Sequence, residues 1–198
     1  MGRRLPVELG RITQDNVEQL RKINLACFPV QYQETYYKDV VTHDEGLCKF
    51  AYWDGFVVGA ACARIEPLPD DSENQKQNHE NASSSNSNNN GSGNKKQKNT
   101  ESGTKKRIYI MTLGVLAAFR DREIGTQLIQ SIFDHYEANK DSGEYKDVVE
   151  IVLHVQISNA AAIKFYTTRF GFEQGKMVEN YYRRIDPPHC YKLFKKLT

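Results

Sequence analysis

The sequence of 198 residues predicts an α/β domain in which a mixed sheet carries helices on its faces. Its second half alternates strand-like and helix-like segments in the order β-α-β-α-β, which is typical of sheets covered by helices. In the first half, apolar runs at 47–53 and 56–65 are joined by Asp54-Gly55, the two-residue signal for a tight hairpin. These two runs are therefore expected to be antiparallel neighbours.

The chain begins with a short apolar edge at 7–12, after which a helix is expected. Asp15-x-x-Glu18 resembles a capping box, a pattern that satisfies free N–H groups at a helix start. The helix should end near Phe28-Pro29. Helical periodicity places four of its residues on the inner face: Val17, Leu20, Ile23 and Cys27.

From about residue 68 to residue 106 the sequence consists mainly of Ser, Asn, Gln, Gly, Lys and acidic residues, with almost nothing to bury. This composition predicts a disordered insertion. Because the insertion begins after one strand and ends at the next, it should lengthen a surface loop of one domain that spans residues 1–198.

Further elements are expected after the insertion: a strand at 107–115, a helix from Ile124, a strand at 148–155 and a helix from Asn159. A turn at 170–172 then leads into a last strand. The helix from Ile124 presents one apolar face, made of Leu128, Ile129, Ile132, Phe133 and Tyr136.

Composition narrows the class of function. The formal net charge of +2 provides no global attraction to nucleic acid or to anionic membranes, so neither partner is expected. The four cysteines are scattered, without the spacing of a zinc site or a redox dithiol, and no metal is expected. No apolar run approaches the roughly 18 residues of a membrane span, and no apolar leader follows Met1. A protein of the cytoplasm, or also of the nucleus, is expected.

The strand at 107–115 leads through a short turn into the helix from Ile124. Free N–H groups at a helix start, together with the positive end of the helix dipole, suit a pyrophosphate. Strand, turn and helix together resemble the acetyl-CoA motif of the GNAT acetyltransferases, Arg/Gln-x-x-Gly-x-Gly/Ala. The matching positions are Arg120, Ile124, Gly125 and Thr126.

The heptapeptide at 153–159, Leu-His-Val-Gln-Ile-Ser-Asn, is a more specific signal. It closely resembles the NatE class of N-terminal acetyltransferases, which modify proteins beginning with Met and a hydrophobic residue. The resemblance implies the GNAT fold, a mixed, mostly antiparallel twisted sheet with helices on both faces, and acetyl transfer from acetyl-CoA. It covers nearly the whole chain except the insertion, and its other segments are 28–32, 109–114, 162–166, 170–172 and 180–182.

The resemblance implies that Tyr109 and His154 are catalytic, because in this family a tyrosine and a histidine on adjacent strands hold a water that deprotonates the α-amine. An α-amine with a pKa of about 8 is mostly protonated at pH 7, so its attack on a thioester requires a base. A histidine or a histidine-bound water can supply one. The ordinary alternative for His154 is a satisfied core histidine.

The resemblance also implies a clamp around the peptide N-terminus. Strand alternation puts Tyr109 and Met111 on one face of their strand, so both can face the substrate. An apolar slot with tyrosine hydroxyls suits a Met side chain and backbone polar groups. The other implied substrate residues are Phe28, Pro29, Val30, Tyr32, Tyr181 and Tyr182.

Positions matching the acetyl-CoA contacts of the family extend from the strand end through the phosphate turn to the second helix. Asn159 is expected near the pantetheine arm, although its position also fits a helix N-cap. Tyr166 is expected near the thiol, as a candidate proton donor to the leaving thiolate. The full implied set is Leu113, Gly114, Val115, Arg120, Asp121, Arg122, Glu123, Ile124, Gly125, Thr126, Asn159 and Tyr166.

The chain departs from the family pattern at two places. Glu123 stands where the first glycine of the phosphate loop is usual, so its charge would lie beside two phosphates. Like charges about 4 Å apart cost ~1 to ~4 kcal/mol, which is roughly 5-fold to 1000-fold in affinity. Arg120 and Arg122 flank this position and could neutralise it. The second departure is one extra residue at 167–169, expected to lengthen the helix end or to form a bulged turn.

Three functions are compatible with this pattern. The leading one is an active acetyl-CoA-dependent enzyme that acetylates nascent or free protein N-termini. Glu123 motivates the second, a weakly active or inactive subunit retained for association with NatA, whose auxiliary and catalytic subunits the resemblance implies as partners. The third is lysine acetylation, which is less favoured because a lysine amine is more basic than an α-amine and harder to deprotonate at neutral pH.

Overall fold

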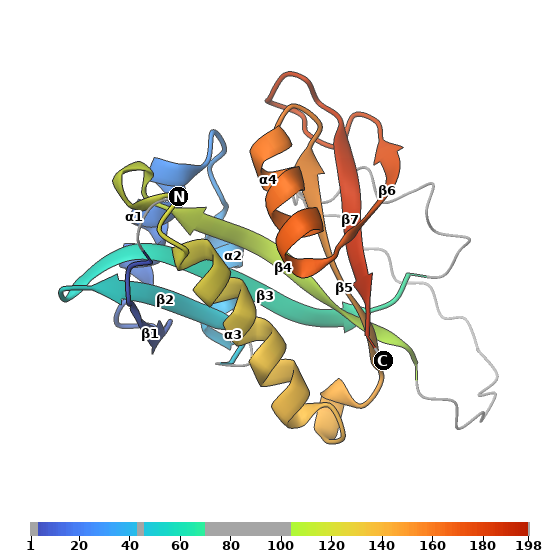
Figure 1. The fold of residues 1–198 in the computed structure, drawn as a ribbon, viewed down its shortest axis with the longest axis horizontal. Coiled ribbons are helices and arrows are strands. Elements are labelled where there is room, and N and C mark those ends of the chain that lie inside the picture. Colours follow the sequence, from blue (N-terminus) through green and yellow to red (C-terminus); the bar gives the residue numbers. More distant parts are fainter. Residues whose placement is uncertain (1–3, 43–45, 70–103, 198) are drawn as a thin grey trace, which may run out of the picture.

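The computed structural model describes residues 4–42, 46–69 and 104–197, and within these ranges the chain forms a seven-stranded sheet flanked by helices (Figure 1). The strands are β1 Glu8–Arg11, β2 Cys48–Trp53, β3 Phe56–Pro67, β4 Lys106–Val115, β5 Val148–Gln156, β6 Glu173–Val178 and β7 Cys190–Lys196. The α-helices are α1 Val17–Cys27, α2 Glu34–Thr42, α3 Ile124–Asn139 and α4 Ala160–Lys164. None of the helices in these ranges is long and apolar enough to cross a bilayer.

The sheet has the order β1-β2-β3-β4-β5-β7-β6. Every neighbouring pair is antiparallel except β4 and β5, which are parallel. A parallel pair needs a long crossover, and α3 provides it between β4 and β5. The predicted fold class, a mixed and mostly antiparallel sheet with helices on both faces, is confirmed.

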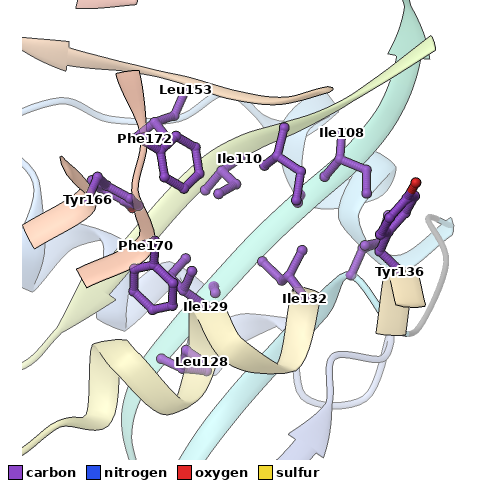
Figure 2. Close-up of a cluster of buried hydrophobic side chains, with 14 of the residues drawn as sticks. Ile108, Ile110, Leu128, Ile129, Ile132, Tyr136, Leu153, Tyr166, Phe170 and Phe172 are labelled. Carbon is purple, nitrogen blue, oxygen red and sulfur yellow. The ribbon is translucent and has the colours of Figure 1, made fainter. Parts of the chain in front are cut away.

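Two apolar clusters lie on opposite faces of the sheet, one under α1 and α2 and the other under α3 and α4 (Figure 1). The predicted inner face of α3 is buried except for Phe133, which is half-buried. Figure 2 shows Ile129 and Ile132 of α3 pointing toward Ile108 and Ile110 of β4. The 3.6-residue period thus places this helix against the strand that carries Tyr109.

The start of α1 differs from the predicted capping box. Its N-cap residue is Asn16, and no side chain caps the helix there. The Asn16 carboxamide oxygen instead accepts a hydrogen bond from the N–H of Thr13, which closes the turn before the helix. The predicted inner face is otherwise correct, except that Asn24 is buried whereas Cys27 is only half-buried.

The ends of the predicted insertion belong to the sheet. Pro67 pairs with Lys106 across β3 and β4, and the N–H of Leu68 donates to the carbonyl of Lys105. The remainder of the predicted disordered segment, residues 70–103, lies outside the described residues. The insertion therefore connects two adjacent antiparallel strands without interrupting the ladder between them.

The hairpin between β2 and β3 has the predicted two-residue turn, in which Asp54 and Gly55 have φ values of 49° and 77°. A Cβ added at Gly55 would meet nothing within 4 Å, so only the left-handed backbone opposes a side chain. We expect Gly55→Ala to lower the free energy of unfolding by about 1–2 kcal/mol in urea denaturation. Asp54→Asn is the control, because asparagine tolerates this conformation and should leave stability nearly unchanged.

Candidate active site

A β-bulge in β4 lies at the centre of the site. Cys62 of β3 is opposite Thr112 and Ala63 is opposite Ile110, so Met111 has no partner across the ladder. A bulge inserts one extra residue and re-aims the side chains that follow it. The sequence analysis predicted that Tyr109 and Met111 share a face, but it contained no sign of the bulge.

The bulge changes the alternation along β4. Before it, Ile108 and Ile110 face α3, and after it Leu113 contacts the same cluster, which strict alternation would place on the other face. Gly114 faces α1, where an added Cβ would lie 3.2 Å from Cys27. Two positions predicted to bind acetyl-CoA therefore face the packed layers: the Val115 side chain packs against the core, and the Cα of Gly114 lies against α1.

The strands β4 and β5 separate toward their C-terminal ends, as Figure 1 shows. Their pairing ends at Tyr109 and Val152, and a cavity of about 180 Å³ lies between the segments that follow. The cavity is lined from the strands by 110–113 and 153–156. Its other lining residues are Phe28, Pro29, Val30, Tyr32, Asn159, Ala162, Tyr166, Tyr182 and Ile185.

Tyr109, His154 and Tyr181 meet beside this cavity. The Tyr109 hydroxyl oxygen lies 3.3 Å from Nδ1 of His154 and 3.0 Å from the hydroxyl oxygen of Tyr181. The His154 and Tyr181 rings are stacked with centroids 4.5 Å apart. The structure thus brings both predicted catalytic residues into contact, together with one of the predicted substrate tyrosines.

The protonation states of this group follow from its burial. Burial, and then the charges of Arg107 and Lys192, lower the pKa of His154 to about 4. Burial and the neighbouring Tyr181 raise the pKa of Tyr109 well above its ordinary value. At neutral pH the imidazole is therefore uncharged and able to accept a hydrogen bond, and the Tyr109 hydroxyl keeps its proton.

The loop between α1 and α2 forms one side of the cavity, as predicted for 28–32. The ring centroids of Phe28 and Tyr32 are 5.9 Å apart, and those of Tyr32 and Tyr36 are 4.6 Å apart. The Tyr36 hydroxyl lies 2.9 Å from the Thr112 hydroxyl, which ties this aromatic row to β4. A row anchored to a strand in this way is suited to hold an apolar side chain at a defined place.

The opposite side comes from the segment between β6 and β7. Tyr182 and Ile185 line the cavity, and the Tyr182 N–H donates a hydrogen bond to the carbonyl of Pro188. The sequence analysis named Tyr182 but missed Ile185, which lies in a loop with no periodic pattern. It also did not name Gln156, although Gln156 lies within the heptapeptide that carries the resemblance.

The predicted phosphate turn lies at the start of α3, outside the cavity lining. Glu123 is the N-cap residue, with a left-handed φ of 62°, and its side chain makes no capping hydrogen bond to the helix. Its carboxylate accepts a hydrogen bond from Arg169 instead, over 3.1 Å. Arg120 donates to the carbonyl of Val115. Glu123 is therefore paired with Arg169 and not with Arg120 or Arg122, the flanking arginines that could have neutralised it.

Helix α4 and the turn that follows it confirm two structural expectations. Asn159 caps α4 by accepting a hydrogen bond from the N–H of Ala162, and it also lines the cavity. The extra residue at 167–169 is accommodated by a π-helical turn, Phe165–Arg169, which keeps Tyr166 on the cavity wall. Burial raises the pKa of Tyr166, so its hydroxyl is protonated at neutral pH.

No metal is part of this arrangement as far as the structure describes it: residues 4–42, 46–69 and 104–197 contain no group of three or more His, Cys, Asp or Glu able to hold a metal ion. The site combines a split between two strands, a helix start with free backbone N–H groups and an uncharged histidine. This combination fits a thioester co-substrate with a long arm and a diphosphate. These features define an acyltransferase site.

A family model described as "Acetyltransferase (GNAT) family" matches residues 17–172. The chain therefore belongs to the GNAT acetyltransferase family. N-alpha-acetyltransferase 50 of Danio rerio is 38% identical over 191 residues, which cover 96% of this chain and 89% of that protein. The probable N-acetyltransferase san of Drosophila melanogaster is also 38% identical, and the match covers 98% of this chain and 83% of that protein.

Among solved structures, Arabidopsis thaliana Naa50 in complex with the bisubstrate analogue CoA-Ac-MVNAL is similar, with a TM-score of 0.71. It is 33% identical, and the match covers 98% of this chain and 100% of that one. The predicted class, an acetyl-CoA-dependent N-terminal acetyltransferase like the catalytic subunit of NatE, is thereby confirmed.

Proposed function

We propose that this enzyme acetylates the α-amine of proteins that begin with Met followed by a hydrophobic residue, and that Tyr109 and His154 carry the proton transfer. The proposal rests mainly on the contact between these two residues at the edge of a cavity that the apolar loop between α1 and α2 lines. The peptide of the Arabidopsis bisubstrate analogue, which begins Met-Val, supports the same substrate class.

The peptide N-terminus would bind between the two loops that line the cavity. Phe28, Pro29 and Val30 offer apolar surface from one side, and Tyr182 and Ile185 face them from the other. Met111, the bulged residue of β4, also lines the cavity. Burial raises the pKa of Tyr32 and of Tyr182, so their hydroxyls remain protonated and can donate to backbone carbonyls of the peptide.

His154 and Tyr109 would together hold the water that removes the proton from the α-amine. The uncharged imidazole supplies an acceptor, and the protonated Tyr109 hydroxyl supplies a donor 3.3 Å away. Acetyl-CoA supplies the acetyl group as a thioester, which the free amine attacks. The new N–C bond forms as the C–S bond breaks. The proton removed from the amine passes through the held water to solvent, and Tyr166 on the cavity wall is the proposed donor of a proton to the departing sulfur, after which Tyr166 is reprotonated from solvent.

The residues that would hold acetyl-CoA fit its chemistry. The separated segments 110–113 and 153–156 would flank the pantetheine arm. Backbone N–H groups of Ile124, Gly125 and Thr126, at the start of α3, would bind the diphosphate. The Glu123 carboxylate does not block this helix start, because it is bonded to Arg169 and makes no capping bond to the helix.

The substrate class is tested with one peptide, Met-Leu followed by a short sequence containing a single Lys, in free and Nα-blocked forms. A matched Ser-Leu peptide tests the first side chain. We expect acetylation of the free Met-Leu peptide to be at least about tenfold faster than that of either control, with mass spectrometry placing the acetyl group on the α-amine.

Faster acetylation of Lys in the blocked peptide would instead establish a lysine acetyltransferase. Calorimetry that detects no acetyl-CoA binding would favour the inactive subunit.

We also propose that the enzyme associates with the NatA auxiliary and catalytic subunits and works in the cytoplasm, with the nucleus as a second location. The support is the likeness to NatE catalytic subunits. Affinity purification of the tagged full chain from its own cells, with NatA subunits quantified by mass spectrometry, tests the association. Recovery of these subunits no better than with an untagged control would contradict the association. Fractionation of the same cells tests the location.

A further inference from the structure

The two places where this chain departs from the family pattern lie against each other. Glu123, which replaces a glycine, is the N-cap residue of α3, and Arg169 ends the π-helical turn that accommodates the extra residue. Nη2 of Arg169 donates to Oε1 of Glu123 over 3.1 Å, although 46 positions separate them in the sequence. The side chains are 40% and 35% exposed, respectively.

The π-helical turn is fixed beside the start of α3 by packing. An added Cβ at Gly125 would lie 3.6 Å from the Phe165 ring. Phe170, next to Arg169, is buried, and its ring stacks on that of Phe133 with centroids 5.7 Å apart. Arg169 is therefore held at the surface immediately beside the helix start.

The position of the Glu123 carboxylate matters because α3 is where the diphosphate of acetyl-CoA would bind. A carboxylate at a helix N-cap is attracted to the same N–H groups and dipole that attract a phosphate. In the structure this carboxylate makes no capping bond and is engaged by Arg169. Arg120 is bonded to the carbonyl of Val115, and Asp121, with a φ of 59°, adds a second carboxylate to the turn.

We propose that Arg169 is a positioning residue for acetyl-CoA: by binding the Glu123 carboxylate it keeps that charge away from the first turn of α3 and neutralises it, so that the diphosphate can bind there. The inference rests on the proposed function, because it requires acetyl-CoA to bind at the start of α3. On this proposal, the extra residue at 167–169 compensates for the missing glycine at position 123.

The test is a double-mutant cycle on the full chain, with Arg169→Ala, Glu123→Gln and the combined variant. Calorimetry with acetyl-CoA should show about tenfold weaker binding for Arg169→Ala, which is within the range for an exposed carboxylate near a phosphate. In steady-state kinetics the KM for acetyl-CoA should rise, whereas kcat and the KM for the peptide should not change. The combined variant should recover most of the lost affinity, because the Glu123 carboxylate is no longer there to repel the diphosphate.

Two further variants separate this role from general effects of charge and folding. Lys164→Ala removes one positive charge from an exposed position on the neighbouring α4 and should weaken binding far less. Arg169→Lys keeps the charge and should retain most of the affinity. Thermal unfolding of each variant checks that the fold is intact.

Three results would overturn the proposal. Arg169→Ala with unchanged affinity would show that Glu123 needs no neutralisation. An equal loss with and without Glu123→Gln would mean that Arg169 acts on the ligand independently of Glu123. A loss equal to that of Lys164→Ala would mean that only net charge matters. Absence of acetyl-CoA binding by the unmodified protein would instead contradict the proposed function, which distinguishes the two failures.

Discussion

Replacing His154 with Ala is expected to lower kcat for acetylation of a Met-Leu peptide by roughly 10²- to 10⁴-fold, the usual contribution of a general base. The reason is that His154 is the uncharged imidazole in contact with Tyr109 at the cavity. Acetyl-CoA affinity, measured by calorimetry, should change little, since the proposed diphosphate site lies at the start of α3. Tyr109→Phe, which removes only the hydroxyl, should also lower kcat, by a smaller factor.

A matched control for this loss is available in the same chain. His135 of α3 also lies beside a tyrosine hydroxyl, with Nε2 3.0 Å from the hydroxyl oxygen of Tyr145, but it does not line the cavity. His135→Ala should therefore reduce stability without a comparable loss of kcat. If His154→Ala kept kcat within a few-fold of the unmodified enzyme, His154 would be a packed core histidine and the base would have to be sought elsewhere.

Acidification is expected to destabilise the protein through the same histidine. The pKa of His154 is about 4 in the folded protein, and an unfolded chain would have the ordinary value of about 6.5. Between these values the unfolded state binds more protons, so stability is full above pH 6.5 and is lost as the pH falls toward 4. The total loss is about 3 kcal/mol, most of it between pH 6.5 and pH 4.5.

Urea unfolding at pH 7 and pH 4.5, compared between the unmodified protein and His154→Phe, isolates this contribution. Phenylalanine keeps a ring that can stack on Tyr181 but cannot titrate, so the variant should lose less stability on acidification. Other titrating groups affect both proteins alike and cancel in the difference. Equal losses of stability in the two proteins would mean that the folded state does not lower the pKa of His154.

Local patterns predicted the elements that depend on local causes. The Asp54-Gly55 turn follows from its two residues, because they tolerate positive φ where most others do not. The helix from Ile124 follows from its apolar period, which needs only one face to be buried. The capping box at Asp15 shows the limit of such reasoning: the motif is present, but Asn16 is the N-cap residue.

The candidate site was predicted from resemblance more than from physics. Tyr109 and His154 are 45 positions apart, and no period or composition relates them until β4 and β5 lie side by side. Many of the residues named from the matching segments line the cavity, but Gly114 and Val115 do not, and Tyr109 and Tyr181 lie beside it. Ile185 was missed because its contact depends on the path of an irregular loop.

The sequence by itself determined most of the strands and helices in order, the hairpin turn, the buried face of α3 and the class of enzyme, because each rests on a short pattern. It did not indicate α2 or β7. Only the tertiary structure decided the bulge at Met111, the separation of β4 from β5 and the pairing of Glu123 with Arg169. The physical reason is that these features arise from contacts between distant parts of the chain. A strand's register, a cavity and an ion pair exist only once the partner segment has been packed in place.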